Sequence, residues 1–480
     1  MEYTATIGLE VHAELNTKTK IYCGCKNAFG GEVNSNCCPI CMGLPGTLPT
    51  LNQQVVEYCI KMGHALNCKI NRVTKQDRKH YFYPDLPKAY QISQFDIPLC
   101  ENGFVDAIID DKGSTKRIGV TRIHIEEDAG KLIHDDAFRG SLIDFNRCGV
   151  PLIEIVSEPD MHSSDDAKAY LETLKQILLY LGISDCKMQE GSLRCDVNVS
   201  IAPKGSDKLG TRVEMKNVNS FSAAVRAIDY EIARQKKILE EGGELHQETR
   251  KWDDANNCNI LLRSKEDADD YRFFPEPDLI TIVVPEEKVK ALKDSLPELP
   301  QKRTLRFMQD FSLPMFDANL LTEFRDRGDF FEEVCKKGAN PKSTANWLNG
   351  DVARLLGEWN KTLADTALTP DNLAQMVKLI DKKVISNTAG KQVIEETMKT
   401  GKTPDEIINE KGLAQLSDEN ALSDIVEKVL SANPQVIEQY KNGKTNVVGF
   451  LVGQCMRESK GKGNPEILRN LILSKLSPLS

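Results

Sequence analysis

The 480-residue sequence contains no apolar run that approaches the roughly 18–20 residues of a membrane span, which argues against a membrane protein. Its first residues, MEYTATIG, lack the basic and apolar regions of a secretory leader, so we expect a cytoplasmic protein. The formal net charge of −9 shows no excess of positive charge. Any nucleic acid therefore has to bind at a local basic patch or with the help of another subunit.

Familiar nucleotide and metal signatures are also missing. The sequence has no G-x-x-x-x-G-K-[ST] loop, no dinucleotide glycine fingerprint and, among its seven histidines, no H-E-x-x-H. The nearest candidate for phosphate binding is QEGSLRCD (189–196), where Gly191 and Ser192 precede a predicted strand. A plain turn is the alternative interpretation of this stretch.

The composition, with 40% hydrophobic and 28% charged residues, is typical of a globular protein, and the length suggests about three domains. Short alternating segments dominate the first ~290 residues, with helices predicted over 165–182 and 220–243. Helical periodicity replaces the alternation from about residue 286. We expect an α+β protein, with a mainly antiparallel β-sheet cradle domain (1–291), an all-α helical domain (292–405) and a small α-helical tail domain (406–480).

Cysteine is abundant, with 14 residues, and in a cytoplasmic chain thiols or metal ligands are expected rather than disulfides. The stretch 23–41 contains Cys23-x-Cys25 and Cys38-x-x-Cys41. Two close pairs of thiolates on separate turns form a tetrahedral site that favours zinc, and four filled positions indicate a structural role. A reduced, metal-free loop is the alternative.

Four predicted strands have one apolar face and one polar face. The polar faces contain Glu10 and His12; Arg122, His124 and Glu126; Asp196, Asn198 and Ser200; and Arg212, Glu214 and Lys216. If the apolar faces cover one core, the polar faces form a continuous floor. Converging carboxylates favour a hard cation such as Mg²⁺, and the arginines and lysine suit phosphate oxygens. The alternative is a salt-bridged outer face of a sheet.

Two other stretches combine positive charge with further features. The stretch 77–96 is dense in aromatic and basic side chains, which suits base stacking, a polar passage or ordinary packing. Near the C-terminus, RESKGKGNP contains Arg457, Lys460 and Lys462 in a region with seven basic and two acidic residues. This patch suits contacts with an RNA backbone, and the alternative is a solvated helix end.

Eight stretches in order, IGLEVHAEL, CPICMGLPGTLP, FYPDLPKAYQISQ, HIEEDAGK, PLIEIVSEPD, EGSLRCDVNVSI, EMKNVNSF and DYRFFPEPDL, resemble one family. They are similar to the B subunits of glutamine-dependent aspartyl/glutamyl-tRNA amidotransferases, and VGFLVGQCMRESKGKGNP resembles the tail domain of that family. The resemblance covers essentially the whole chain. It implies ATP- and Mg²⁺-dependent phosphorylation of the side-chain carboxylate of mischarged Glu-tRNA(Gln) or Asp-tRNA(Asn), followed by amidation with ammonia.

The resemblance also implies roles for individual residues. Glu10, His12, Glu127 and Glu214 match the magnesium and catalytic pocket, although strand alternation favours Glu126 over Glu127. Lys79 and Tyr81 match the passage through which ammonia reaches the pocket. Ser192, Arg194, Arg212 and Lys216 are candidate nucleotide contacts. The zinc motif occurs in only some members, so structural Zn²⁺ depends on the four cysteines themselves.

The sequence shows neither a Ser/Ser/Lys amidase signature nor a Cys–His nucleophile, so this chain is not expected to release ammonia from glutamine. The resemblance implies that an amidase A subunit does so and that a small C subunit bridges the two. Two alternatives stay open: a zinc-bearing RNA-binding or scaffold protein, and a metallohydrolase with a metal at Glu10, His12 and His124. Whether Glu-tRNA(Gln), Asp-tRNA(Asn) or both is the substrate stays open too.

Overall fold

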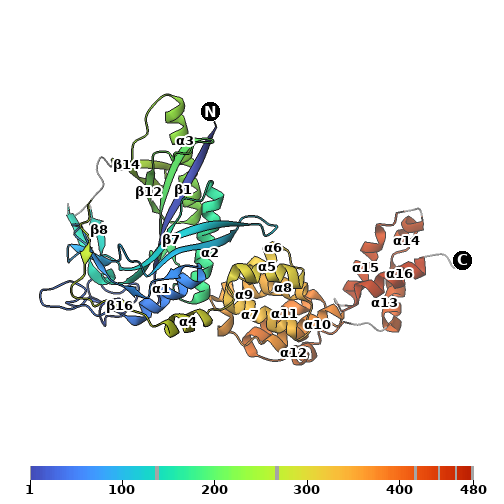
Figure 1. Cartoon of the computed structure of the whole chain (residues 1–480). Helices are drawn as coiled ribbons and strands as arrows, with labels where there is room; N and C mark the ends of the chain where they lie inside the picture. Colours follow the sequence, from blue (N-terminus) through green and yellow to red (C-terminus); the bar gives the residue numbers. More distant parts are fainter. Residues whose placement is uncertain are drawn as a thin grey trace. The chain divides into compact units, whose positions relative to one another are not determined.

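The computed structural model describes residues 2–135, 140–264, 270–415, 419–441, 444–459 and 462–476. The chain divides into two compact units, residues 1–305 and 306–480 (Figure 1). The first combines a large sheet with helices, and the described part of the second is helical, which confirms the predicted α+β class. Within these described ranges, none of the helices is both long enough and apolar enough to cross a membrane.

A nine-stranded sheet forms the centre of the first unit, and all neighbouring strands are antiparallel except β12 and β13. Most of it is therefore the antiparallel sheet that the alternation predicts. In spatial order the strands are β14 (Cys258–Ser264), β13 (Glu248–Asp253), β12 (Val213–Val218), β11 (Leu193–Pro203), β1 (Tyr3–Glu14), β10 (Pro151–Ser157), β7 (Thr115–Glu127), β6 (Cys100–Ile108) and β2 (Lys69–Ile70).

Helices α1 (Gln53–Ala65), α2 (Ser164–Leu181) and α3 (Phe221–Glu240) pack against the apolar face of this sheet. Strand residues such as Ile7, Leu9 and Val11 are at most 1% exposed in the shared core. Burial of one face leaves the other face of the central strands free for polar side chains.

The sequence predicts α2 and α3 correctly because both have clear end signals. The Ser163 side chain accepts a hydrogen bond from the Asp166 amide, and Ser220 accepts one from Ala223, which satisfies free N–H groups in each first turn. Helix α2 ends where Gly182 adopts a left-handed conformation with φ of 65°.

Shorter strands surround the polar face. One small sheet has the order β15 (Phe274–Pro275), β4 (Asp77–His80) and β5 (Tyr90–Ser93). Two further pairs are β3 (Val73–Thr74) with β16 (Ile282–Val283) and β8 (Lys131–Asp135) with β9 (Gly140–Asp144). Short 3₁₀ turns span Phe145–Arg147 and Met188–Glu190.

The first unit extends beyond the predicted end of the cradle domain. The boundary at 291 falls inside α4 (Glu286–Asp294), which packs on α1. Lys288 Nζ lies 2.8 Å from Glu57 Oε1, and His64 Nε2 lies 3.1 Å from the Val289 carbonyl oxygen. These contacts attach α4 to the sheet-containing unit.

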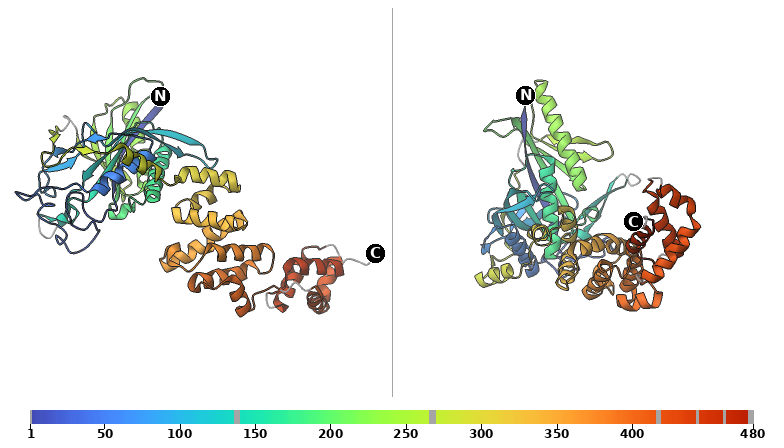
Figure 2. Two further views of the ribbon diagram at one scale, coloured as in Figure 1. Left: turned by 60° about the horizontal axis from the view of Figure 1, so that its bottom comes forward. Right: turned by 90° about the vertical axis from the view of Figure 1, so that its right-hand side faces the viewer.

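Figure 2 shows helices throughout the described part of the second unit, coloured yellow to red. They begin with α5 (Pro300–Phe311), which spans the boundary between the units, and continue with α6 (Met315–Leu321), α7 (Arg325–Lys336), α8 (Pro341–Trp347), a π-helical turn at Leu348–Val352, α9 (Ala353–Trp359), a 3₁₀ turn at Leu363–Asp365, α10 (Pro370–Asp381), α11 (Asn387–Thr400), α12 (Pro404–Lys411), α13 (Glu419–Ala432), α14 (Pro434–Lys441), α15 (Val447–Glu458) and α16 (Pro465–Leu476).

Two separate hydrophobic cores lie in the second unit. One contains buried residues between Phe307 and Ile408, and the other contains buried residues between Leu422 and Leu476. The further division into a helical domain (292–405) and a tail domain (406–480) stays a prediction.

Candidate active site

Polar residues of five neighbouring strands face each other across the free side of the large sheet. The strand register places Glu214 of β12 opposite Asn198 of β11, and Asp196 of β11 opposite Glu10 of β1. On the other side of β1, His12 lies opposite Glu154 of β10. Because side chains directly opposite in adjacent antiparallel strands are close neighbours, the row forms one continuous surface.

The first ligand group of this surface consists of His12, Glu126 and Glu154, whose candidate ligand atoms lie within 4.8 Å of one another. His12 Nε2 is 3.5 Å from Glu154 Oε2 and 3.7 Å from Glu126 Oε1. His124 Nε2 lies 3.2 Å from Glu154 Oε2, so two imidazoles contact one carboxylate. Both carboxylates are buried.

The protonation of this group follows from the pairing of opposite charges. Burial disfavours a charged carboxylate, but the charges and hydrogen bonds of His124 and His12 outweigh it and lower the pKa of Glu154 well below its usual range. Burial alone would lower the pKa of His124, yet Glu154 and Glu126 raise it to about 9. The carboxylates of this group are therefore ionised and pair with protonated imidazoles. A metal ion that binds these carboxylates would take the place of the imidazolium charges.

The second ligand group consists of Glu10, Asp196 and Glu214, again with candidate ligand atoms within 4.8 Å of one another. Lys216 Nζ lies 2.6 Å from Asp196 Oδ2 and 2.9 Å from Glu214 Oε1. Asn198 donates a hydrogen bond to Glu10 Oε1 at 3.1 Å. Burial, followed by the negative charges of Glu154, Asp196 and Glu214, raises the pKa of Glu10. A cation at this position would relieve that repulsion.

Both ligand groups line one cavity of about 390 Å³, which we call the acidic pocket. Cations from several elements line it as well: Lys79, Arg122, Arg212 and Lys216. The mixture of carboxylates and cations in one cavity suits a phosphorylated ligand bound with a divalent metal ion. This volume falls within the usual range for small-molecule sites.

Glu127 does not line the acidic pocket. Its Oε1 accepts a hydrogen bond from the Ile92 amide at 2.9 Å and pairs with Lys88. Together with Tyr22 and Cys23, Glu127 and Lys88 line a different cavity of about 210 Å³. Adjacent residues of a strand point to opposite faces, so only Glu126 reaches His12. The geometry therefore favours Glu126, the residue that alternation favours, over Glu127, the residue chosen on the resemblance, and the ligand assignment stays a prediction.

The candidate nucleotide contacts also fall into two sets, one inside and one outside the acidic pocket. Arg212 and Lys216 line the acidic pocket, whereas Ser192 and Arg194 do not. Arg194 lies opposite His12 in register, but its guanidinium contacts Asp128 Oδ2 at 2.9 Å. Ser192 accepts a hydrogen bond from the Lys187 amide at 2.7 Å and donates one to Asp185, so it closes a turn. The plain-turn interpretation describes Ser192.

The candidate passage residues lie at the aromatic side of the pocket. Lys79 lines the cavity, and its Nζ lies 4.8 Å from the centroid of the Tyr271 ring. The Tyr81 ring meets that of Tyr271 edge-on, with centroids 6.3 Å apart. Phe82 and Tyr83, the next two residues in the sequence, are 79% and 60% exposed and do not line the acidic pocket.

Sequence reasoning missed Glu154 as a site residue, although a signal was present. In PLIEIVS, Glu154 is the single charged residue of a strand in which six of the seven residues are buried. A charge in such a strand is costly unless it is paired or binds a cation, so it marks a site. Phe95 lies in the aromatic and basic stretch 77–96, whereas the contribution of Tyr271 and Phe273 to the pocket has no comparable sequence signal.

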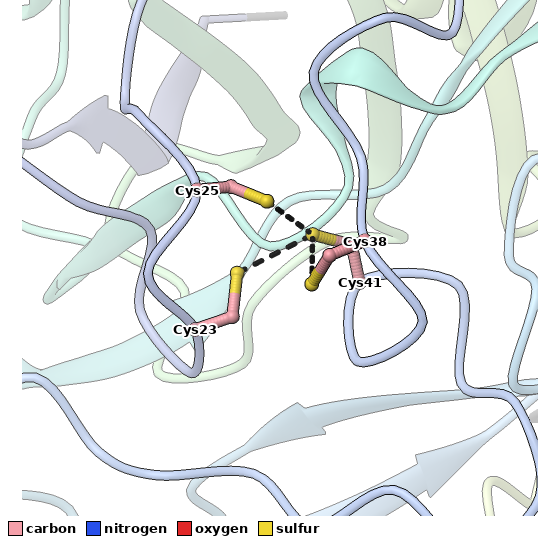
Figure 3. Close-up of side chains that lie close together, drawn as sticks. All are labelled: Cys23, Cys25, Cys38 and Cys41. Atoms are coloured by element: carbon pink, nitrogen blue, oxygen red, sulfur yellow. Dashed lines mark hydrogen bonds between the residues drawn. The ribbon is translucent and has the colours of Figure 1, made fainter.

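The four cysteines of the 23–41 motif converge as predicted (Figure 3). Cys41 Sγ lies 3.3 Å from that of Cys23, 3.6 Å from that of Cys38 and 3.7 Å from that of Cys25. A tetrahedral site with Zn–S bonds of about 2.3 Å places the sulfurs about 3.8 Å apart, so these positions fit zinc. The hydrogen bond to Cys23 is the largest cause that lowers the pKa of Cys41, which favours a thiolate.

Lys20 lies against this cysteine cluster and is fully buried. Its Nζ donates to the Asn36 carbonyl oxygen at 2.8 Å and contacts Cys41 Sγ at 3.6 Å. Within the described ranges, no carboxylate forms an ion pair with it. A buried Lys side chain at this position can pair with the negative charge that thiolates carry when they bind zinc.

In the second unit, the candidate RNA contacts Arg457 and Lys462 are exposed. Arg457 lies in the last turn of α15. Lys460 lies outside the described residues. Exposure is compatible with a contact to RNA but does not distinguish it from a solvated helix end.

Comparisons with known proteins identify the family to which the sequence is similar. Residues 5–290 match the family described as the GatB/GatE catalytic domain, and residues 329–476 match the GatB domain. The chain is similar to proteins named as the B subunits of aspartyl/glutamyl-tRNA(Asn/Gln) amidotransferases. It is 52% identical over 482 residues to that of Caldicellulosiruptor saccharolyticus, with both chains fully covered. It is 54% identical over 477 residues to that of Caldanaerobacter subterraneus, with 99% of this chain and 100% of that protein covered.

Proposed function

Because this chain belongs to the family of aspartyl/glutamyl-tRNA(Asn/Gln) amidotransferase B subunits, we propose that its acidic pocket activates the side-chain carboxylate of a mischarged aminoacyl-tRNA. The chain acts in a glutamine-dependent carbon–nitrogen ligase together with the other subunits of the amidotransferase. The substrate is Glu-tRNA(Gln), Asp-tRNA(Asn) or both. The convergence of two ligand groups and several cations on one cavity is the observation that supports the proposal best.

The chemistry requires a better leaving group than a carboxylate offers. A carboxylate oxygen of the substrate attacks the γ-phosphorus of ATP, ADP leaves, and an acyl phosphate forms. Ammonia then attacks the carbonyl carbon, and phosphate leaves with the bonding electrons while a proton is released. Positioning and neutralisation of charge provide most of the catalysis in such a phosphoryl transfer.

The cations of the pocket have distinct tasks in this scheme. Arg122 and Arg212 bind phosphate oxygens and neutralise the charge of the triphosphate, which suits their planar guanidinium groups. Lys216, held between Asp196 and Glu214, orients those two carboxylates. Water has to be kept away from the acyl phosphate in the acidic pocket, because it would hydrolyse this intermediate.

The two ligand groups would hold Mg²⁺. His12, Glu126 and Glu154 offer one set of ligands, and Glu10, Asp196 and Glu214 offer another. When bound, Mg²⁺ neutralises the β- and γ-phosphate oxygens of ATP. His12 Nε2 lies 3.5 Å from Glu154 Oε2. His12 would bind the ion as the neutral imidazole, so metal binding would release its proton.

We assign Cys23, Cys25, Cys38 and Cys41 to a structural Zn²⁺ ion, because four sulfur ligands leave no open position for catalysis. A site of free thiols needs a reducing compartment, so we place the protein in the cytoplasm. The zinc ion would fix the loop that contributes Tyr22 and Cys23 to the cavity around Lys88.

The other subunits would provide what the pocket lacks. An amidase A subunit releases ammonia from glutamine, and a small C subunit bridges the two chains. Lys79 and Tyr81, at the aromatic side of the pocket, border the route by which ammonia enters. The tail residues Arg457, Lys460 and Lys462 contact the tRNA backbone.

The test uses the complete complex with ATP, glutamine and mischarged tRNA, and measures amide formation with the native chain and with Glu10→Gln. We expect the variant to lose two or more orders of magnitude in rate, because the change removes one charged ligand from the pocket. Glutaminase activity of the A subunit, measured in the same samples, serves as the control for assembly. Amide formation at the native rate by a folded Glu10→Gln complex would overturn the proposal.

A further inference from the structure

A wall of aromatic side chains closes one side of the acidic pocket. Phe95, Tyr271 and Phe273 line the same cavity as the carboxylates and cations. The rings of Phe95 and Phe273 are stacked, with centroids 4.2 Å apart and planes inclined by 8°. Tyr271 meets Phe273 edge-on, with centroids 6.1 Å apart. Phe95 nevertheless is 56% exposed, so a large part of its surface has no protein neighbour.

The wall is held in place by hydrogen bonds of buried residues. Phe95 follows β5, and its amide donates to Asp77 Oδ2 at 3.0 Å. The preceding residue, Gln94, is 3% exposed and bonds to Thr74 Oγ1 at 2.8 Å and to the Ile125 amide at 3.1 Å. Phe273 precedes β15, the opposite edge strand of the same small sheet. The ring of Phe95 is therefore fixed before any ligand binds, which lowers the entropy cost of stacking.

The chemistry of the side chains that line the cavity defines its ligand. The lining includes cations suited to phosphate oxygens, and it also includes aromatic rings suited to stacking with the face of another ring. The amino-acid side chain that is amidated has no ring for such stacking. A nucleotide combines both features, and the reaction of the proposed function uses two adenine-bearing substrates, ATP and the 3′-terminal adenosine of the tRNA.

We propose that Phe95, backed by Phe273, is the stacking platform for an adenine ring in the acidic pocket. The proposal rests on the proposed function, since that function brings both adenine-bearing molecules to this cavity. It adds a base-binding subsite to a pocket whose carboxylates and cations recognise only phosphate and metal. Either ATP or the terminal adenosine of the tRNA is the source of the ring, and the kinetics separate the two.

The test compares Phe95→Ala, Phe95→Leu and Phe95→Trp in the complete complex. The KM for ATP and the KM for mischarged tRNA are measured separately, and kcat is measured at saturation. We expect Phe95→Ala and Phe95→Leu to raise one KM by about 5- to 150-fold, because base–aromatic stacking contributes this range of affinity. Phe95→Trp keeps a flat ring and restores most of the native KM. Phe316→Ala, which removes a phenyl group that is 73% exposed in the second unit, controls for the loss of an exposed ring.

A binding measurement keeps the platform separate from the proposed function as a whole. We expect Phe95→Leu to weaken binding of ATP but not of inorganic tripolyphosphate if the ring belongs to ATP. If the ring belongs to tRNA, the native complex binds an acceptor-stem RNA that ends in adenosine more tightly than an RNA that lacks this nucleotide. Phe95→Leu reduces that difference in affinity. Phe95→Leu keeps an apolar side chain, so a melting temperature near the native value is expected and verifies folding.

Either pattern supports the platform and names its source. Native KM values for both substrates in folded Phe95→Leu and Phe95→Ala complexes would overturn it, and so would a fall in kcat with both KM values unchanged. In those cases ATP-dependent amide formation by the native complex would still support the proposed function. Failure of the native complex to form amide would instead refute that function.

Discussion

The two kinds of ligand group in the first unit are built in opposite ways. The cysteine cluster comes from two turns within residues 23–41, and its four sulfurs lie within 4.8 Å of one another (Figure 3). The ligand groups of the acidic pocket come from strands that span residues 10 to 214, and they face a cavity of about 390 Å³. A site closed by its own ligands fixes a loop, whereas a site open to a cavity leaves positions for substrate. The difference supports the structural role proposed for the cysteine cluster and the catalytic role proposed for the acidic pocket.

The prediction with the largest expected effect tests which carboxylates belong to the acidic pocket. Glu126→Gln should lower the rate of amide formation by about 100-fold or more, because the side chain contacts His12 and lines the pocket. Glu127→Gln should lower it by less than about tenfold, because Glu127 pairs with Lys88 outside the pocket. The rate is measured in the complete complex with saturating ATP and mischarged tRNA.

The two variants differ by one position and make the same chemical change, so each controls for the other. Melting temperatures verify that both complexes are folded. If Glu127→Gln had the larger effect on the rate, the assignment by strand alternation would be wrong and the assignment by family resemblance would stand.

A prediction with a smaller expected effect tests whether the zinc affinity of the cysteine cluster depends on the neighbouring side chains. Lys20→Met should weaken zinc binding by about 10- to 100-fold, because it removes the buried ammonium that contacts Cys41 Sγ. The affinity is measured by competition with a chromogenic chelator, and the rate of amide formation at saturating zinc should stay near the native value. A structural site predicts this separation of zinc affinity from rate.

Lys18→Met is the matched control, since Lys18 is exposed and precedes Lys20 by two residues. Equal zinc affinity of the two variants would show that Lys20 does not compensate the charge of the thiolates. A parallel loss of rate at saturating zinc would place the cluster closer to the chemistry than a structural role allows.

The same contrast explains what could be predicted from the sequence. The convergence of Cys23, Cys25, Cys38 and Cys41 could be predicted because their spacing alone brings the sulfurs together. Helices α2 and α3 were predicted because serine caps and apolar periodicity are local signals. Glu10 and Glu214 were identified, and the structure brings them into one ligand group.

The rest of the pocket depends on which strands pair, and a single sequence does not contain this information in local form. Glu154 joins His12 only because β10 pairs with β1 in one register. The aromatic wall depends on the small sheet of β15, β4 and β5, whose outer strands lie about 180 residues apart in the chain. Such contacts become visible only when the register is known.

The smallest effect concerns Glu14, which lies on β1 beyond Glu10 and His12 but does not line the acidic pocket. Burial and then the neighbouring Asp128 raise the pKa of Glu14 from 4.5 to about 8. The folded chain thus binds this proton more tightly than the unfolded chain does. Its contribution to stability is complete below about pH 4.5 and is lost as the pH rises through about 8.

Glu14→Gln removes this titration without changing the shape of the side chain. Relative to the native chain, the variant should be stabilised on raising the pH from 5.5 to 8.5, by on the order of 1 kcal/mol, since partial exposure and the nearby Arg194 moderate the effect. Urea unfolding midpoints at the two pH values measure the difference, with the exposed Glu32→Gln as control. An identical pH dependence in the native chain and Glu14→Gln would mean that Glu14 is ionised in the folded chain. Glu14 would then resemble the cation-binding carboxylates of the pocket rather than a buried acid outside it.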